Sequence, residues 1–144
     1  MSGIALGYGS PDKTVVGKML SKIEHRGGYI SGSFENGKVV MLQNYLHADT
    51  GQADSDAAVP VEGDDGLRIC YDGQMGNAPE LAQELGIEDG PFREERIMLA
   101  LYRKHGIEMF EKLGDAIFGL AISDGDDLLV ARDLAGIDQP RHQV

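Results

Sequence analysis

The residue at position 2 is the first candidate for chemistry in this chain. The chain begins MSGIALGYGS, and Met followed by a small residue is the usual substrate for removal of the initiator Met. Ser2 would then carry a free amine and a hydroxyl on one residue. Two interpretations follow: Ser2 is a nucleophile, or it is a small residue at a position where a nucleophile is no longer used.

Other reactive side chains do not form recognisable sites. The histidines lack the i, i+3 or i, i+4 spacing of a ligand pair, and they stand at positions 25, 47, 105 and 142. The acidic stretch 124–127 lacks the pattern and terminal Glu of a calcium loop, and GYGSPDK at 7–13 lacks the spacing of a phosphate loop. Cys70 is the only cysteine and is expected to be a buried structural thiol. We therefore expect no metal and no cofactor.

Composition narrows the classes of function. The chain has 144 residues and a formal net charge of −11, which disfavours nucleic acids and anionic membranes because both reward Lys and Arg. A single cysteine excludes an internal disulfide and fits a reducing compartment. The N-terminus does not have the pattern of a signal peptide, and no apolar run approaches the roughly 18–20 residues that span a bilayer. We expect one cytoplasmic domain over residues 1–144.

Hydrophobic periodicity predicts the elements that position these residues. Strands are expected at 3–9 and 67–73, and hairpins at 29–46 and 116–133 around the turns Asn36-Gly37 and Asp124-Gly125-Asp126. Helices are expected at 14–25, 78–86, 93–106 and 107–114, and the acidic stretch 47–66 as a loop. Because the strands cluster in hairpins, antiparallel sheets with helices packed against them are favoured over a parallel sheet.

Four stretches occur in an order that carries a family resemblance: MSGI at the start, IEHRGGYISG (23–32), YDGQMGNAPEL (71–81) and LLVARDLAGIDQP (128–140). They resemble the class II glutamine amidotransferase domain in its asparagine-synthetase-like form. That domain begins MCGI, carries HRGPD, has a strand ending NGEIYN before a helix, and later has ARDxxGIxPL. The resemblance covers about residues 2–140.

The resemblance implies an α+β fold of the N-terminal-nucleophile class, with residue 2 at a sheet edge facing a cleft. That fold is an αββα sandwich of two stacked antiparallel sheets flanked by helices, here truncated. In active members residue 2 is a Cys that hydrolyses glutamine through a thioester, with its own α-amine as the base. An α-amine with a pKa of about 7.7–8.0 can accept a proton near neutral pH. The ammonia released then reaches a synthetase domain.

The catalytic positions depart from the family pattern. The nucleophile position holds Ser2, and Asp72-Gly73 stands where the family has the Asn and Gly of its oxyanion hole. An ionised Asp only accepts hydrogen bonds, and its charge repels a developing oxyanion. Removing one oxyanion donor costs roughly 10²–10³ in rate, and a charge in its place should cost more.

The substrate-binding positions depart as well. Gln74 aligns with the Glu that holds the substrate amine, and Glu94 aligns with the family's acidic residue before its next helix. The family's carboxylate-binding Arg has no counterpart in MLQNYLHAD (41–49). Arg26 is expected to organise a loop or an ion pair rather than to bind substrate.

These departures favour a catalytically impaired domain that binds or regulates a partner. The expected partners are a synthetase subunit or a second copy of the chain, and the expected ligand is glutamine or another amino acid. The alternative is an active N-terminal-Ser amidohydrolase, or an ammonia-supplying glutaminase subunit that needs a synthetase partner. The chain ends RHQV without an ATP-binding segment of the synthetase kind, so it is expected to make no amide product alone.

Overall fold

The computed structural model describes residues 2–26, 30–45 and 59–133, and the structural statements below concern these residues. The strands are β1 (Ser2–Tyr8), β2 (Ile30–Glu35), β3 (Val39–Tyr45), β4 (Val61–Glu62), β5 (Arg68–Met75), β6 (Ala116–Asp124) and β7 (Asp127–Arg132). The α-helices are α1 (Lys13–Ser21), α2 (Ala78–Leu85) and α3 (Arg93–His105). Short 3₁₀ helices are η1 (Glu24–Arg26), η2 (Asp64–Gly66) and η3 (Gly106–Lys112).

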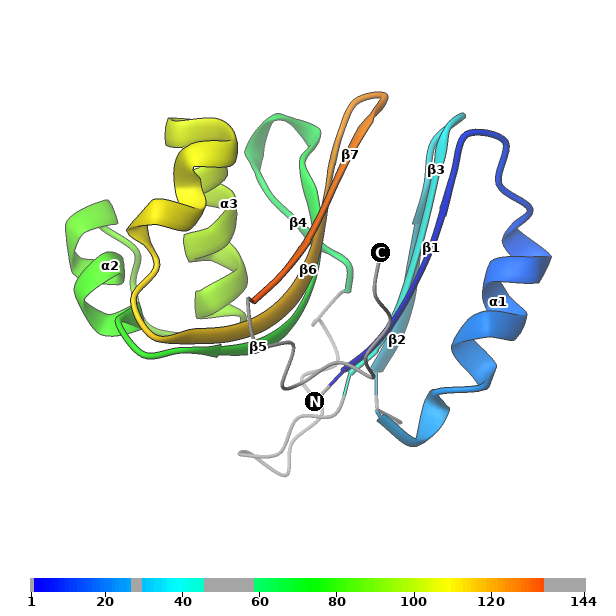
Figure 1. Ribbon diagram of the computed structural model, residues 1–144, viewed down its shortest axis with the longest axis horizontal. Helices are drawn as coiled ribbons and strands as arrows, with labels where there is room; N and C mark the ends of the chain where they lie inside the picture. The colour runs from blue at the N-terminus through cyan, green and yellow to red at the C-terminus, as the bar shows by residue number, and fades with distance from the viewer. Residues whose placement is uncertain (1, 27–29, 46–58, 134–144) are drawn as a thin grey trace.

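The strands form two antiparallel sheets that face each other. One sheet has the order β1-β3-β2, and the other has the order β4-β5-β6-β7. Helix α1 covers the outer face of the first sheet, whereas α2 and α3 cover the outer face of the second (Figure 1). This arrangement confirms the predicted αββα sandwich, and the predicted hairpins are the pairs β2–β3 and β6–β7.

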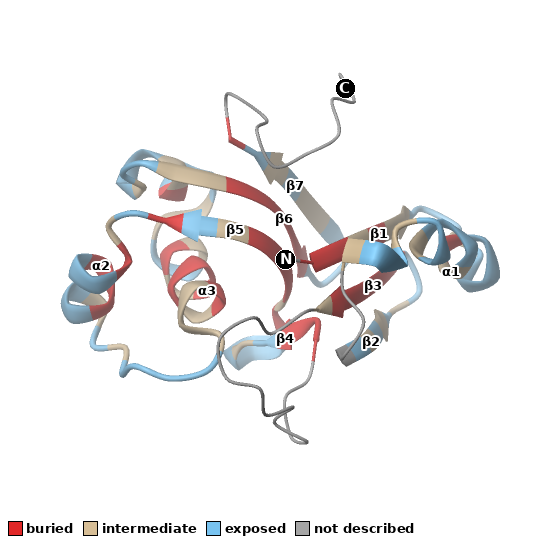
Figure 2. Ribbon diagram, turned by 90° about the horizontal axis from the view of Figure 1, so that it is seen from below, coloured by how far each residue is buried: buried red, intermediate tan, exposed pale blue. Residues whose placement is uncertain are grey.

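Strand alternation divides the apolar residues between three core layers. Successive side chains of a strand point to opposite faces of the sheet. In β3, Val39 and Met41 therefore pack between the sheets, while Val40 and Leu42 pack toward α1. The central layer also contains Cys70, and the layer under α2 and α3 is the largest. Both faces of β3 are buried (Figure 2), which explains its continuous apolar run.

The same alternation places three polar residues in the central layer. Ser2 has the parity of Ile4 in β1, and Gln43 has the parity of Met41 in β3. Asp72 has the parity of Cys70 in β5. All three are buried. A polar group buried between sheets must find hydrogen-bond partners there, so these residues are expected to bond across the layer.

Two expectations need correction. Within the predicted loop 47–66, Val61 and Glu62 form β4 and pair with β5, so that part of the prediction is wrong; residues 46–58 lie outside the described part. The predicted helix 14–25 splits into α1 and η1, and its predicted apolar side is only partly buried, since Val15 and Met19 are 52% and 49% exposed. Because a helix in an outer layer packs against one sheet only, a narrower stripe of apolar side chains is enough to cover its buried side. No described helix is long and apolar enough to cross a membrane.

Candidate functional site

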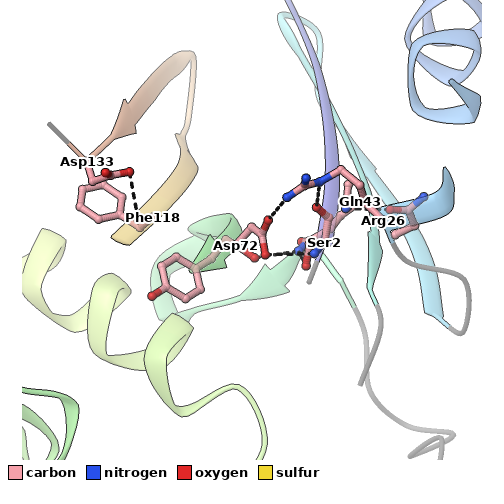
Figure 3. Close-up of polar contacts among 9 residues, drawn as sticks. Ser2, Arg26, Gln43, Asp72, Phe118 and Asp133 are labelled. Atoms are coloured by element: carbon pink, nitrogen blue, oxygen red, sulfur yellow. Dashed lines mark hydrogen bonds and ion pairs between the residues drawn. The ribbon is translucent and has the colours of Figure 1, made fainter. Parts of the chain in front are cut away.

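Ser2 is held by a closed hydrogen-bonded ring that joins the two sheets. Its backbone N–H donates to Asp72 Oδ1 at 3.0 Å, and Arg26 Nη2 donates to Asp72 Oδ2 at 2.7 Å. Arg26 Nε closes the ring by donating to the Ser2 carbonyl oxygen at 3.0 Å (Figure 3). We call this the Ser2–Asp72–Arg26 ring. It confirms the expectation that Arg26 forms an ion pair.

Each member of the ring comes from a different element. Ser2 begins β1, Arg26 ends η1, and Asp72 lies in β5 of the opposite sheet. The Asp72 and Arg26 side chains are 9% and 23% exposed, so little water competes for their ion pair. Next to the ring, Gly3 N–H donates to Asn44 Oδ1 at 2.8 Å, and a Cβ on Gly3 would collide with that side chain. The first residues of β1 are therefore fixed from both sides.

Gln43 contacts the Ser2 hydroxyl, a contact that sequence reasoning missed. Its Nε2 donates to Ser2 Oγ at 3.2 Å and to the Tyr71 carbonyl oxygen at 3.1 Å. Because a carbonyl only accepts, the amide nitrogen must face Tyr71, and Ser2 Oγ accepts its second hydrogen. Gln43 Oε1 is buried without a hydrogen-bond partner in the described part of the chain. The available signal was a Gln at a central-layer position, directly after the apolar run of residues 39–42.

The predicted site residues meet around one small cavity. This cavity of about 370 Å³ is lined by all five: Ser2, Asp72, Gly73, Gln74 and Glu94. A larger hollow of about 1080 Å³ shares two of them but is not lined by Ser2. Among the described residues there is no group of His, Cys, Asp and Glu that could hold a metal ion. The cavity beside Ser2 is therefore the candidate site, and we call it the Ser2 cavity.

Comparison with known proteins identifies the family. The family model of the glutamine amidotransferase domain matches residues 1–140. The chain belongs to this family. It is also similar to the asparagine synthetase [glutamine-hydrolyzing] of Gallus gallus, with 29% identity over 73 residues. That match covers 49% of this chain and 13% of the chicken protein, so the chain spans only a small part of its relative. The protein thus contains an asparagine-synthetase-like amidotransferase domain.

Three of the predicted positions in this amidotransferase domain have clear structural surroundings. Gly73 lies opposite Phe118 of β6, and a Cβ on Gly73 would collide with the Ile117 carbonyl oxygen. Gln74 is exposed at the cavity. Glu94 accepts from the Tyr71 hydroxyl at 2.6 Å and from the Met75 N–H at 3.3 Å. Close packing against β6 therefore explains why position 73 is a glycine. The Glu94 carboxylate, in contrast, already accepts two hydrogen bonds from residues of β5.

Glu95 is a second residue that sequence reasoning did not select. It lies in the first turn of α3, where the helix dipole favours acids, and it lines the Ser2 cavity. Burial raises its pKa to about 7, and repulsion from Glu94 adds to the rise while Arg96 opposes it. Burial, together with the hydrogen bond to Glu94, also raises the pKa of Tyr71. Both groups are therefore neutral over more of the pH range than usual.

The structure also describes Cys70 and the beginning of the last motif, residues 128–133. Cys70 is fully buried in the central layer and burial raises the pKa of its thiol, which confirms a structural cysteine. Asp133 accepts from the Phe118 backbone N–H at 3.3 Å and so ties the end of β7 to β6 (Figure 3). The rest of that motif, residues 134–140, lies outside the described residues.

Proposed function

We propose that this amidotransferase domain is impaired as a glutaminase and serves as a ligand-binding or regulatory module. The Ser2–Asp72–Arg26 ring carries the proposal. By the family resemblance, Asp72 stands where active members present an oxyanion donor, and here both of its oxygens accept hydrogen bonds. A developing oxyanion at this place would meet a carboxylate instead of a donor.

The Ser2–Asp72–Arg26 ring is also unfavourable for the α-amine of residue 2 acting as the base that an N-terminal nucleophile needs. Removal of Met1 would turn the Ser2 nitrogen into an amine, 3.0 Å from Asp72 Oδ1. A carboxylate at that distance favours the ammonium form, which has no lone pair to accept the hydroxyl proton. The Ser2 hydroxyl is also less acidic than the thiol of active members. The Ser2 hydroxyl accepts a hydrogen bond from Gln43, whose amide nitrogen is a donor and not a base.

The direct test is glutamate release from glutamine by purified protein, with Ser2→Ala and Ser2→Cys measured in parallel. Intact-mass analysis first establishes whether Met1 is present. We expect wild type and Ser2→Ala to be indistinguishable, and Ser2→Cys to remain inactive because Asp72 stays in place. Turnover in the wild type that Ser2→Ala abolishes would overturn the proposal and favour an active N-terminal-Ser amidohydrolase.

We also propose that the module works beside a synthetase, in the cytoplasm. The name of the chicken relative supports this partner, because that protein is a glutamine-hydrolysing asparagine synthetase. The buried thiol of Cys70 is free, and a free thiol fits a reducing compartment such as the cytoplasm. Co-purification from the native source, followed by identification of the bound chain, tests the partner. Recovery of the chain only with copies of itself would favour the homo-oligomer.

A further inference from the structure

Strand β7 is an open edge of the second sheet. It pairs with β6 on one side, and no other strand of the described residues pairs with its second side. The Asp133 N–H donates to the Phe118 carbonyl oxygen, and hydrogen bonds to a neighbouring strand alternate along an antiparallel strand. The N–H and C=O groups of Leu128, Val130 and Arg132 therefore point away from β6. A row of unpaired backbone groups is a template on which another strand can pair.

The side chains of β7 are also poorly covered. The strand contains an uninterrupted apolar run over residues 128–131. Val130 has the parity of Leu128, which packs against the central layer, yet Val130 is 59% exposed. Figure 2 shows β7 as intermediate or exposed along its length, whereas most of β6 is buried. Pairing with another strand would bury this apolar surface together with the open edge.

The other edge strands of the described residues are less suited to such pairing. β4 has only two residues, and the exposed residues of β2 are two serines and a glutamate. β1 is engaged at both ends, because the Ser2 carbonyl oxygen accepts from Arg26 and the Tyr8 hydroxyl donates to the Asp126 carbonyl oxygen. β7 is therefore the most favourable of these edges for adding a strand.

The charges of β7 lie at opposite ends of the strand. At the hairpin end, Asp124, Asp126 and Asp127 are exposed. The last residue, Arg132, is exposed and forms no ion pair with another described residue. If two copies paired in parallel, acids would lie beside acids and the two arginines beside each other. In an antiparallel pair, the acidic end of each copy lies beside Arg132 of the other, so β7 is complementary to itself.

We propose that two copies of this chain form a dimer by pairing their β7 strands antiparallel about a two-fold axis. Such an axis places one residue opposite the same residue of the second copy. With Leu129 on the axis, Leu128 faces Val130 of the second copy, and this pair occurs twice. The uncovered Val130 side chain is then buried against an apolar neighbour, and the two sheets become one continuous sheet.

The charges select this register. With Leu129 on the axis, Asp126 faces Arg132 of the second copy, and this ion pair also occurs twice. Moving the axis by one residue toward the end of β7 would place Asp127 opposite Asp133, so that like charges would face each other. The dimer is separate from the proposed function, because no described residue of β7 lines the Ser2 cavity.

Sedimentation velocity over a concentration series tests the proposal by measuring the Kd of the dimer. Asp126→Arg and Arg132→Glu should each raise this Kd at least about tenfold, because each change puts like charges into both ion pairs. An equimolar mixture of the two variants should form a mixed dimer with a Kd within about threefold of the wild-type value, because opposite charges face each other again in both pairs. Lys18→Glu, an exposed charge reversal on α1, is the control and should leave the Kd unchanged.

A second pair of variants tests the apolar contact. Val130→Lys should raise the Kd of the dimer at least about tenfold, whereas the matched control Val15→Lys, at a 52% exposed position of α1, should not. Circular dichroism checks that both variants fold, as expected for two exposed positions.

A wild-type chain that stays monomeric throughout the concentration series would overturn the proposal. A dimer that tolerates both charge reversals would also overturn it, as would a mixture of the two variants that does not dimerise, because the contact would then lie on another surface. None of these measurements involves glutamine, so the proposed impairment is still decided by the glutamate-release assay alone.

Discussion

Replacing the buried acid of α3 should change stability in a pH-dependent way. Burial raises the pKa of Glu95 to about 7 from an ordinary value of 4.5. A raised acid pKa means that the folded protein disfavours the charged form, so the cost is absent below about pH 4.5 and complete above about pH 7. The difference corresponds to about 3 kcal/mol at full ionisation.

Glu95→Gln removes this ionisation cost. Its free energy of unfolding relative to wild type should therefore increase by about 2–3 kcal/mol between about pH 5 and about pH 8.5, whatever constant offset the amide introduces. Urea denaturation of both proteins across this range measures the difference. Glu84→Gln is the control, because its exposed carboxyl stays in water in both states. A difference between Glu95→Gln and wild type that does not vary with pH would refute the reasoning.

Three further changes test other parts of the structure. Arg26→Met should lower the free energy of unfolding, measured by urea titration, by about 2 kcal/mol, because it leaves the largely buried Asp72 carboxylate without its ion-pair partner. The control Lys13→Met breaks the exposed pair with Glu35 and should change the free energy of unfolding by less than about 0.5 kcal/mol. Gly73→Ala should lower the free energy of unfolding by at least about 2 kcal/mol, because the added Cβ collides with the backbone of β6. Gly37→Ala is the control, because a Cβ there meets open space. An equal loss of stability in both variants would contradict the packing argument. Cys70 should react with a thiol reagent only after unfolding, so rapid labelling of the native protein would contradict its burial.

The fold was predictable to the extent that local signals agreed with the tertiary structure. Asn36-Gly37 and Gly125 stand at the hairpin turns as expected, because tight turns favour these residues. Strand β4 escaped prediction because it has only two residues, Val61 and Glu62, inside a stretch rich in Gly and Asp. It pairs with the next strand, β5, across the short connection 63–67, but two residues are too few to show the alternating pattern from which a strand is predicted.

The site was predictable only through motifs. The family resemblance selected Ser2, Asp72 and Glu94 by their place in the sequence, and the structure brings them to one cavity. It did not select Gln43 or Glu95, because neither stands at a motif position. Their importance depends on burial and on which neighbours are missing, and both are properties of the folded packing. Strand parity is the sequence signal closest to revealing Gln43.

If the domain is impaired as proposed, the Ser2–Asp72–Arg26 ring predicts that a single reversion does not restore catalysis. Asp72 Oδ2 accepts a hydrogen bond from Arg26 Nη2, a group that can only donate. An Asn at position 72 could keep Oδ1 for the Ser2 N–H, but its amide nitrogen would then place a second donor against the guanidinium. The donor required for an oxyanion and the present position of Arg26 are therefore incompatible. Under the proposed function, the charge that joins the two sheets also opposes amide hydrolysis, so glutaminase activity is expected to require rebuilding of the Ser2–Asp72–Arg26 ring and not only of Ser2.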